Sequence, residues 1–126
     1  MKGRTMALKI HNTLSGRKED FEPINDPVTM YVCGVTPYDE SHFGHAMSYI
    51  FFDVIRRYLK YRGYNLKHAQ NITDIDDKII NRAARDGIST SELAEKYTRS
   101  YFEDMDALNI LRPDIKPANE QEKNKS

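Results

Sequence analysis

Two histidines three residues apart are the first candidates for chemistry in this sequence. They lie in the tetrapeptide His42-Phe43-Gly44-His45, which follows a short apolar strand, Val28–Val32, and a loop, and which precedes an amphipathic segment. A strand, a loop and a helix N-terminus in this order offer backbone N–H groups and a positive helix end to phosphate. The histidine spacing places both rings on one face of the first turn, and Gly44 lets a flat ring or a phosphate approach the backbone. The pattern predicts a nucleotide site, and a simple helix cap is the plainer alternative.

A helix and a second strand follow the histidine pair. Apolar residues at spacings of three and four predict a helix over about residues 46–62, with Gly63 as its stop. Its predicted buried stripe consists of Met47, Ile50, Phe51, Val54, Ile55, Tyr58 and Leu59. The cations of its last turns, which suit the negative helix end, are Arg56, Arg57, Lys60 and Arg62. Residues 64–70 then form a plausible strand, which the connecting helix makes parallel to the first.

The loop after the second strand is the other half of the predicted site. Ligands of an open parallel sheet bind at the carboxyl ends of its strands. Residues 71–73 should therefore lie beside the loop that contains Cys33, at the edge where the histidine pair begins its helix. The site hypothesis rests on this convergence of two loops.

Two more helices and a hairpin complete the predicted elements. Thr73 and Asp76 are typical of a capping pair for a helix ending near Asp86-Gly87, and Ser89 with Glu92 forms a capping box for a longer one. The buried side of the longer helix is predicted to be Leu93, Tyr97, Tyr101, Met105 and Leu108, with Asn109 and Pro113 at its end. Runs at residues 7–10 and 21–24 around a turn at 15–18 predict a short β-hairpin or arm.

Charge and composition narrow the functional classes. The chain has 126 residues with 19 basic and 19 acidic side chains, which fits one domain without a global positive field for nucleic acid or membrane. No apolar run approaches the roughly 20 residues of a membrane span. A single cysteine excludes an internal disulfide and favours a reducing, cytoplasmic location. Residues 115–126 are polar and are expected to form a disordered tail. The carboxylates of Asp74, Asp76 and Asp77 are better explained by the helix dipole than by a metal.

The motifs resemble those of a known family. The tetrapeptide at 42–45 resembles the "HIGH" signature of class I aminoacyl-tRNA synthetases. Cys33-Gly34-Val35-Thr36 and Asn71-Ile72-Thr73-Asp74-Ile75-Asp76-Asp77-Lys78 narrow the resemblance to the cysteinyl-tRNA synthetases, over residues 8–113. The resemblance implies an α/β fold, in which residues 1–114 are the N-terminal half of a Rossmann-like (HUP-type) parallel-sheet nucleotide-binding domain. It implies ATP-dependent formation of cysteinyl-adenylate and transfer to tRNA(Cys), as the N-terminal part of a cysteine–tRNA ligase.

The same resemblance assigns an ATP site. It implies that His42 and His45 are the catalytic pair, donating hydrogen bonds to the ATP phosphates while adenine lies against Gly44 and Thr36 lies beside the nucleotide. A carboxylate attacking the α-phosphorus needs positioning and stabilisation of charge on phosphate oxygens, which Mg²⁺ would share.

A cysteine site is implied as well. By resemblance, Gly34 and Thr73 contact the substrate cysteine, and Cys33 is a zinc ligand rather than the small buried hydrophobe that a lone cysteine usually is. Zinc bound to the substrate thiolate would favour sulfur over the hydroxyl of serine. The family takes its other ligands from downstream sequence, and His11 and His68 have no ligand spacing, so we expect this chain alone to bind zinc weakly or not at all.

Two alternatives remain open at this stage. Pro37 gives a "TPYD" run that resembles the related cysteine ligase of mycothiol synthesis. The K-M-S-K-S loop of the class is not found, since the echo at Lys123-Asn124-Lys125-Ser126 has no strand to frame it, and complete ligase activity of this chain is not expected. The neutral charge is compatible with the other alternative, a truncated paralogue acting as a nucleotide-binding or interaction module. tRNA binding is expected only within a longer protein. A half-domain also leaves an open sheet edge, which predicts self-association.

Overall fold

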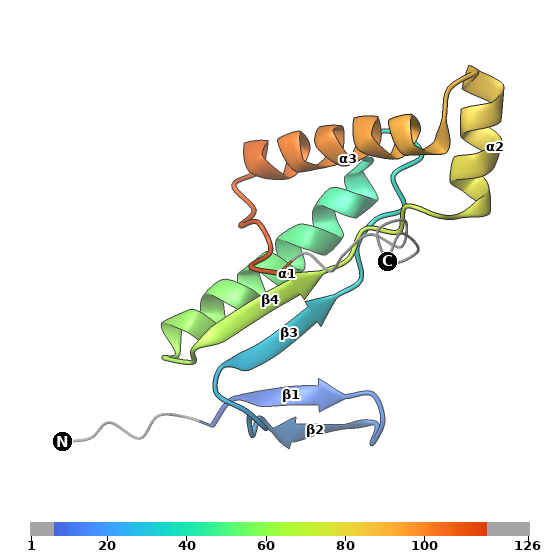
Figure 1. Cartoon of the computed structure of the whole chain (residues 1–126). Coiled ribbons are helices and arrows are strands. Elements are labelled where there is room, and N and C mark those ends of the chain that lie inside the picture. Colours follow the sequence, from blue (N-terminus) through green and yellow to red (C-terminus); the bar gives the residue numbers. More distant parts are fainter. Residues whose placement is uncertain (1–6, 116–126) are drawn as a thin grey trace.

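Three helices and two small sheets make up residues 7–115, which is the part of the chain described by this computed structural model (Figure 1). The elements in chain order are β1 (Lys9–Asn12), β2 (Arg17–Asp20), β3 (Val28–Val32), α1 (Phe43–Tyr61), β4 (Leu66–Gln70), α2 (Asp77–Asp86) and α3 (Thr90–Ala107). The predicted tail lies outside the described residues, except for Ile115.

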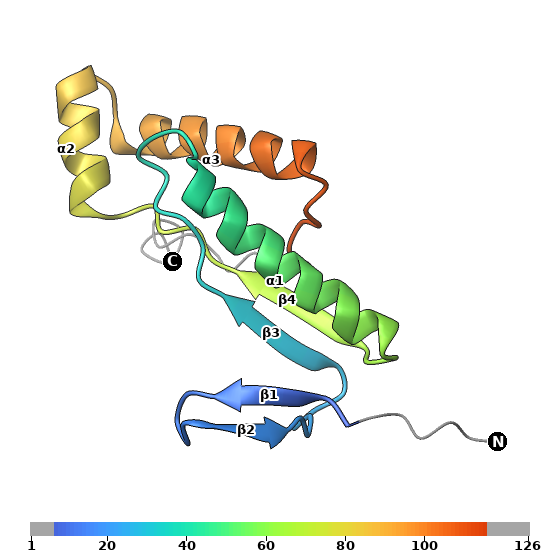
Figure 2. The same cartoon turned by 180° about the vertical axis from the view of Figure 1, so that it is seen from behind.

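The predicted parallel strand pair is confirmed. β3 and β4 pair in parallel, with Val28 opposite Leu66 and Val32 opposite Gln70. α1 connects the two strands and covers one face of the pair (Figures 1 and 2). The second strand begins two residues later than predicted, at Leu66. Both strands therefore end at the same edge, where the two predicted site loops begin.

The edge of β4 that faces away from β3 also has a partner. Ile115, at the start of the predicted tail, forms a parallel bridge with Ala69. Its amide donates to the carbonyl of His68 at 3.1 Å, and its own carbonyl accepts from the amide of Gln70 at 3.2 Å. The sheet therefore extends beyond β4, whereas no strand among residues 7–115 pairs with the other edge of β3.

The N-terminal hairpin is confirmed, but its second strand was predicted wrongly. β2 covers the charged residues Arg17–Asp20 rather than residues 21–24, and it pairs antiparallel with β1. The turn precedes Arg17, and Gly16 takes a positive φ of 68° in it. Lys9 and Asp20 form an ion pair at 3.4 Å. Because both strands are mostly exposed, an apolar pattern does not locate them.

α1 is present, but a different face of it is buried from the one that was predicted. The helix starts at Phe43, three residues early, because His42 caps it. Its buried side carries Tyr49, Arg56 and Leu59, with the partly buried Phe52 between them, again at spacings of three and four. Most of the predicted stripe is exposed, namely Met47, Ile50, Phe51, Val54 and Tyr58. The described strands and α3 cover a narrow side of α1, and the apolar stripe faces solvent.

The contacts of Arg56 explain much of the difference between the predicted and the observed buried face of α1. The sequence assigned this arginine only to the cations that suit the negative end of the helix, yet just 3% of it is exposed. Its guanidinium donates to the carbonyl oxygens of Leu111 and Arg112 at 3.1 and 2.7 Å and pairs with Asp114 at 2.9 Å. One nitrogen also lies 3.2 Å from Nδ1 of the buried His68. The arginine therefore fastens the segment after α3 to α1 and β4.

α3 closes the core above the parallel pair. Tyr101, Phe102 and Met105 of α3 pack with Val32 and Tyr49, while Leu93 and Tyr97 pack with α2. The prediction for Leu108 is wrong, since 45% of it is exposed beyond the end of the helix.

The caps of the last two helices follow the sequence with one exception. Ser89 accepts from the amide of Glu92 at 3.1 Å, and Gly87 ends α2 with a φ of 70°. The cap of α2 is Asp76, which accepts from the amide of Lys78, so the predicted cap at Thr73 is wrong. The chain between Thr73 and Asp76 has no regular secondary structure, and the amide of Thr73 donates to the carbonyl of Val35.

Candidate functional site

Two loops are joined at the carboxyl ends of β3 and β4. The amide of Gly34 donates to Oδ1 of Asn71 at 2.8 Å, and the amide of Thr73 donates to the carbonyl of Val35 at 3.1 Å. Each loop donates one of these two bonds, so together they fix the position of the loops relative to each other. The expected convergence of the loops is therefore present in the structure.

Gly34 is required by how closely the loops approach. A Cβ atom at this position would lie 1.5 Å from the backbone carbonyl oxygen of Asn71. That separation is far inside van der Waals contact, so any side chain here would push the loops apart. The sequence motif around residue 34 thus has a structural reason that does not depend on a ligand.

Cys33 presents its thiol at this junction. Its side chain is exposed and unpaired by disulfide, with Sγ 3.7 Å from the carbonyl oxygen of Gly34. Its backbone carbonyl accepts from the phenol of Tyr49 at 3.1 Å. Among residues 7–115 there is no group of three or more His, Cys, Asp or Glu side chains that could hold a metal ion. Cys33 can supply one ligand, and the described residues do not fit a complete zinc site.

His42 and His45 form a reciprocal cap at the start of α1. The amide of His45 donates to Nδ1 of His42 at 3.4 Å, and the amide of His42 donates to Nδ1 of His45 at 3.3 Å. The two rings stack with centroids 3.8 Å apart and an angle of 16° between planes. The capping that was the plainer reading of this pair is therefore real, and it orders both rings at a helix N-terminus.

This cap also sets the protonation of both rings. An Nδ1 atom that accepts an N–H must be unprotonated, so each neutral ring carries its proton on Nε2. Partial burial, reinforced by the neighbouring His42 ring, lowers the pKa of His45 below its ordinary value. At neutral pH His45 is thus a neutral hydrogen-bond donor. The pair offers two N–H groups beside the free backbone N–H groups of the first turn, and this arrangement suits phosphate oxygens.

Gly44 makes room for the first of these rings. A Cβ atom on Gly44 would lie 3.0 Å from Cε1 and Nδ1 of His42. The space over this residue, which was expected to receive adenine, is taken by the imidazole of His42. A nucleotide base could reach Gly44 only after that ring turns about its side-chain bonds.

The remaining predicted site residues lie in the same two loops. Thr36 is half-buried, and its carbonyl accepts from the amide of Tyr38 at 3.0 Å. The hydroxyl of Thr73 lies 3.5 Å from the side-chain nitrogen of Asn71. Asp74 is 96% buried and precedes α2, so the dipole explanation given for it from the sequence is wrong, although it holds for Asp76 and Asp77 at the helix start.

Sequence reasoning missed the part played by Asn71. Its side chain accepts from Gly34 across 37 residues, and a partner so distant leaves no periodic signal. Asparagine directly after a buried strand was the available hint, because an amide side chain there can bond to a neighbouring loop.

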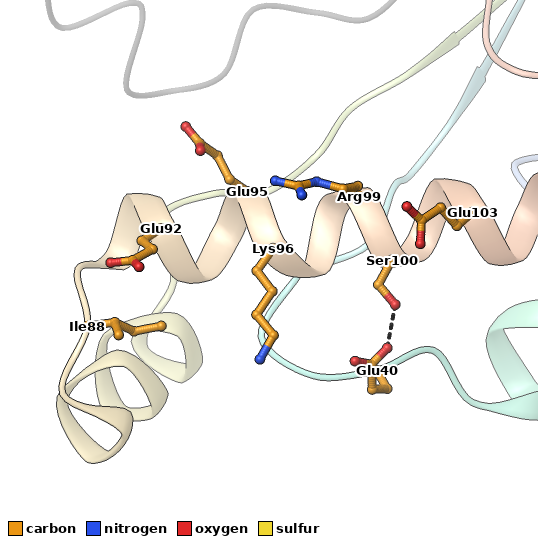
Figure 3. Close-up of a pocket in the computed structure, with 8 residues that line it drawn as sticks. All are labelled: Glu40, Ile88, Glu92, Glu95, Lys96, Arg99, Ser100 and Glu103. Atoms are coloured by element: carbon orange, nitrogen blue, oxygen red, sulfur yellow. Dashed lines mark hydrogen bonds between the residues drawn. The ribbon is translucent and has the colours of Figure 1, made fainter.

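The loop before His42 is also held by α3. An open pocket of about 560 Å³ is lined mainly by charged side chains of α3. Figure 3 shows its lining residues, among which Ser100 donates to the carboxylate of Glu40. Cys33, His42 and Thr73 do not line this pocket. Its relevance to the candidate site is that the bond fixes the chain two residues before the histidine cap.

A parallel strand–helix–strand unit with a phosphate-type helix start at its carboxyl edge defines a Rossmann-like nucleotide-binding fold. The family model described as "tRNA synthetases class I (C) catalytic domain" matches residues 20–124. The chain belongs to this family of class I synthetase catalytic domains.

Curated relatives and solved structures agree with this assignment. The chain is 56% identical over 111 residues to the cysteine--tRNA ligase of Thermodesulfovibrio yellowstonii, covering 87% of this chain and 23% of the relative. It is 58% identical over 116 residues to the cysteine--tRNA ligase of Dehalococcoides mccartyi, covering 91% and 25%. The Mycobacterium tuberculosis methionyl-tRNA synthetase, solved with methionyl-adenylate, superposes with a TM-score of 0.64 at 27% identity, over 71% of this chain and 18% of that one. The chain spans about a quarter of the length of these curated relatives.

No helix among the described residues is long and apolar enough to cross a membrane.

Proposed function

We propose that this chain is the N-terminal part of the catalytic domain of a cysteine–tRNA ligase, which activates cysteine with ATP and transfers it to tRNA(Cys) in the cytoplasm. The observation that carries the proposal is the meeting of three features at one sheet edge: the Cys33 thiol, the joined loops at Gly34 and Asn71, and the histidine cap of α1. The names of the relatives at 54–58% identity supply the amino acid and the acceptor.

Each part of this sheet edge would have a role in the reaction. The carboxylate of cysteine attacks the α-phosphorus of ATP, a P–O bond forms, and pyrophosphate leaves with the electrons of the broken bond. Nε2–H groups of His42 and His45, with Mg²⁺, would stabilise the charge on the phosphate oxygens during this step. Thr36 and Gly44 would border the nucleotide. The cap orders both rings at the start of α1, and the His42 ring would turn aside from Gly44 to admit the base.

The cysteine end of the site would lie at the joined loops. Gly34 and Thr73 would border the substrate beside Cys33, and the amides of both are fixed by bonds between the loops. Zinc at Cys33 would add selectivity for a thiolate, because borderline-soft Zn²⁺ binds sulfur well. The described residues supply one of the roughly three protein ligands that such a site needs, so we place the others in the remainder of a longer protein.

The mycothiol-pathway ligase remains the runner-up, and the relatives' names favour the tRNA enzyme over it. A chimera separates the two. The matching segment of this chain would replace the 111 matching residues of the Thermodesulfovibrio yellowstonii ligase, and the product would be assayed for charging of tRNA(Cys) and for joining cysteine to glucosaminyl-inositol. We expect tRNA charging, lost in the same chimera with His42→Ala and His45→Ala. A folded chimera that charges no tRNA would contradict the proposal, and one that uses only the sugar would establish the runner-up.

We further propose that the isolated chain self-associates. Apolar side chains gather on the exposed side of α1, namely Phe43, Met47, Ile50, Phe51, Val54 and Tyr58. Exposed apolar patches and unpaired strand edges both promote association between protein molecules. Among residues 7–115, one edge of β3 has no partner strand. Sedimentation velocity should show dimers or larger species that dissociate in a Phe51→Glu/Val54→Lys variant. A monodisperse monomer across the micromolar range would contradict this proposal.

A further inference from the structure

Three buried polar side chains connect the end of β4 to the Cys33 loop. They are Gln70 of β4, Tyr101 of α3 and Tyr49 of α1, and each is at least 92% buried. Nε2 of Gln70 donates to the hydroxyl of Tyr101 at 2.7 Å, and the hydroxyl of Tyr49 donates to the carbonyl oxygen of Cys33 at 3.1 Å. The two ends of the series are thus a sheet residue and the backbone of the loop that bears the only thiol.

The two tyrosines join the ends into one series. Their rings meet edge to face with centroids 5.4 Å apart. The proton of Tyr49 is committed to Cys33, and the oxygen of Tyr101 accepts from Gln70. Ring contact between the two phenols therefore joins the Gln70–Tyr101 bond to the Tyr49–Cys33 bond.

Packing alone does not account for these hydroxyl groups. A phenylalanine would fill each tyrosine position with the same ring, as Phe102 does beside Tyr101 in the same core. Burying a hydroxyl is costly unless it is hydrogen-bonded. Here the cost is offset by bonds that end on a backbone carbonyl at the candidate site. A connected buried network also holds its members more rigidly than separate bonds do.

We propose that Gln70, Tyr101 and Tyr49 form a relay that positions the Cys33–Gly34 loop for binding of the cysteine substrate. The three are positioning residues, since they act through the loop backbone and none of them touches the reacting atoms. The relay holds the loop from the core side, while Asn71 holds it from the neighbouring loop. This inference rests on the proposed function for its substrate, although the holding of the loop can be tested without one.

The first measurement follows the loop itself by amide hydrogen exchange in the purified chain. The reporters are the amides of Gly34 and Thr73, whose bonds join the two loops. Tyr49→Phe and Tyr101→Phe keep the rings and remove the relay. We expect exchange at both reporters to rise about five-fold, the effect of roughly one lost hydrogen bond, with α3 amides unchanged. Tyr61→Phe, on the exposed side of α1, is the matched control.

The second measurement separates positioning from general weakening. Affinities for ATP and for a non-hydrolysable cysteinyl-adenylate analogue are measured by titration calorimetry on the same variants. We expect Tyr49→Phe to weaken binding of the analogue about five-fold and to leave ATP affinity almost unchanged, because ATP alone lacks the cysteinyl group.

The outcomes distinguish the two proposals. Unchanged exchange at both reporters in both tyrosine variants overturns the relay. Faster exchange with unchanged affinity for the analogue overturns its role in cysteine binding. If the folded wild-type chain binds neither ligand, the failure lies with the proposed function, and the exchange data still decide whether the relay holds the loop.

Discussion

The backbone of Gly34 and the side chain of Asn71 are joined by a 2.8 Å hydrogen bond, at a point where residue 34 has no room for a Cβ atom. The close approach of these residues fixes the distance between the two loops of the candidate site. A change at either residue should therefore alter the site and the stability of the fold together.

Gly34→Ala tests this close approach. The added methyl group meets backbone rather than a movable side chain, so we expect a loss of roughly 3 kcal/mol or more in the free energy of unfolding, typical of severe overpacking. Gly16→Ala is the matched control, since Gly16 has a positive φ but open space around it, and about 1 kcal/mol is expected there. Urea unfolding measures both. Equal losses would show that the approach is looser than described.

The two functions of His42 can be separated by substitution. Asparagine is a good N-cap residue, so His42→Asn should keep the stability of the wild type within about 0.5 kcal/mol, whereas His42→Ala should cost about 1 kcal/mol. Both variants lose the Nε2–H group, and both should bind ATP more weakly. Thermal unfolding measures the stability of each variant, and titration calorimetry measures its affinity for ATP. If His42→Asn bound ATP as well as the wild type, the histidine would be only a cap.

Arg56 should contribute far more to stability than its neighbour Arg57. Arg56→Leu leaves the carbonyls of Leu111 and Arg112 and the carboxylate of Asp114 without their donor. We expect a loss of roughly 3 kcal/mol, because several hydrogen bonds donated by one charged, buried group are removed together. Arg57→Leu removes a partly exposed i, i+4 pair with Asp53 and a hydrogen bond to the carbonyl of Asn109, and should cost about 1 kcal/mol. Similar losses in urea unfolding would contradict the assigned burial.

Stability should fall when the pH drops below about 6.5, the ordinary pKa of histidine. Burial, and then the charge of Arg56, lower the pKa of His68 in the folded state. The unfolded chain therefore takes up this proton first, so the stabilisation is complete above the unfolded pKa and is lost as pH falls through the folded pKa. One such group gives a slope of at most about 1.4 kcal/mol per pH unit.

The control for this pH effect is His68→Asn, which keeps an acceptor near Arg56 without titrating. His45, whose pKa is also lowered, titrates in both proteins, so the difference between the two curves isolates His68. Urea unfolding between pH 7.5 and 5 measures the curves. A His68→Asn curve as steep as that of the wild type would rule out this origin.

Local signals predicted the elements that position the site. β3 was placed correctly because an apolar run is bounded by Pro27 and Gly34, and the histidine tetrapeptide marked the start of α1 because capping is a local property of the chain. The family resemblance then supplied the role of Cys33, which spacing alone could not.

Long-range contacts determine the features that the sequence patterns predicted wrongly, namely the buried face of α1 and the cap of α2. The apolar stripe of α1 has the better helical pattern, yet the face carrying Arg56 is buried because its partners lie more than 50 residues away. Thr73 was a plausible cap, but its amide bonds to Val35 in another loop and the helix begins later, with Asp76 as its cap. Periodicity and local capping patterns contain no information on such partners.

The central claim is that the edge bearing Cys33 and the histidine cap binds a cysteinyl-adenylate. The most direct test is titration calorimetry of the purified chain with the non-hydrolysable cysteinyl-adenylate analogue, with and without zinc, alongside a His42→Ala/His45→Ala variant shown to be folded. We expect the wild-type chain to bind and the variant to bind at least about ten-fold more weakly, since two donors to charged phosphate oxygens are lost. A folded wild-type chain that does not bind the analogue, or a variant that binds it equally well, would contradict the claim.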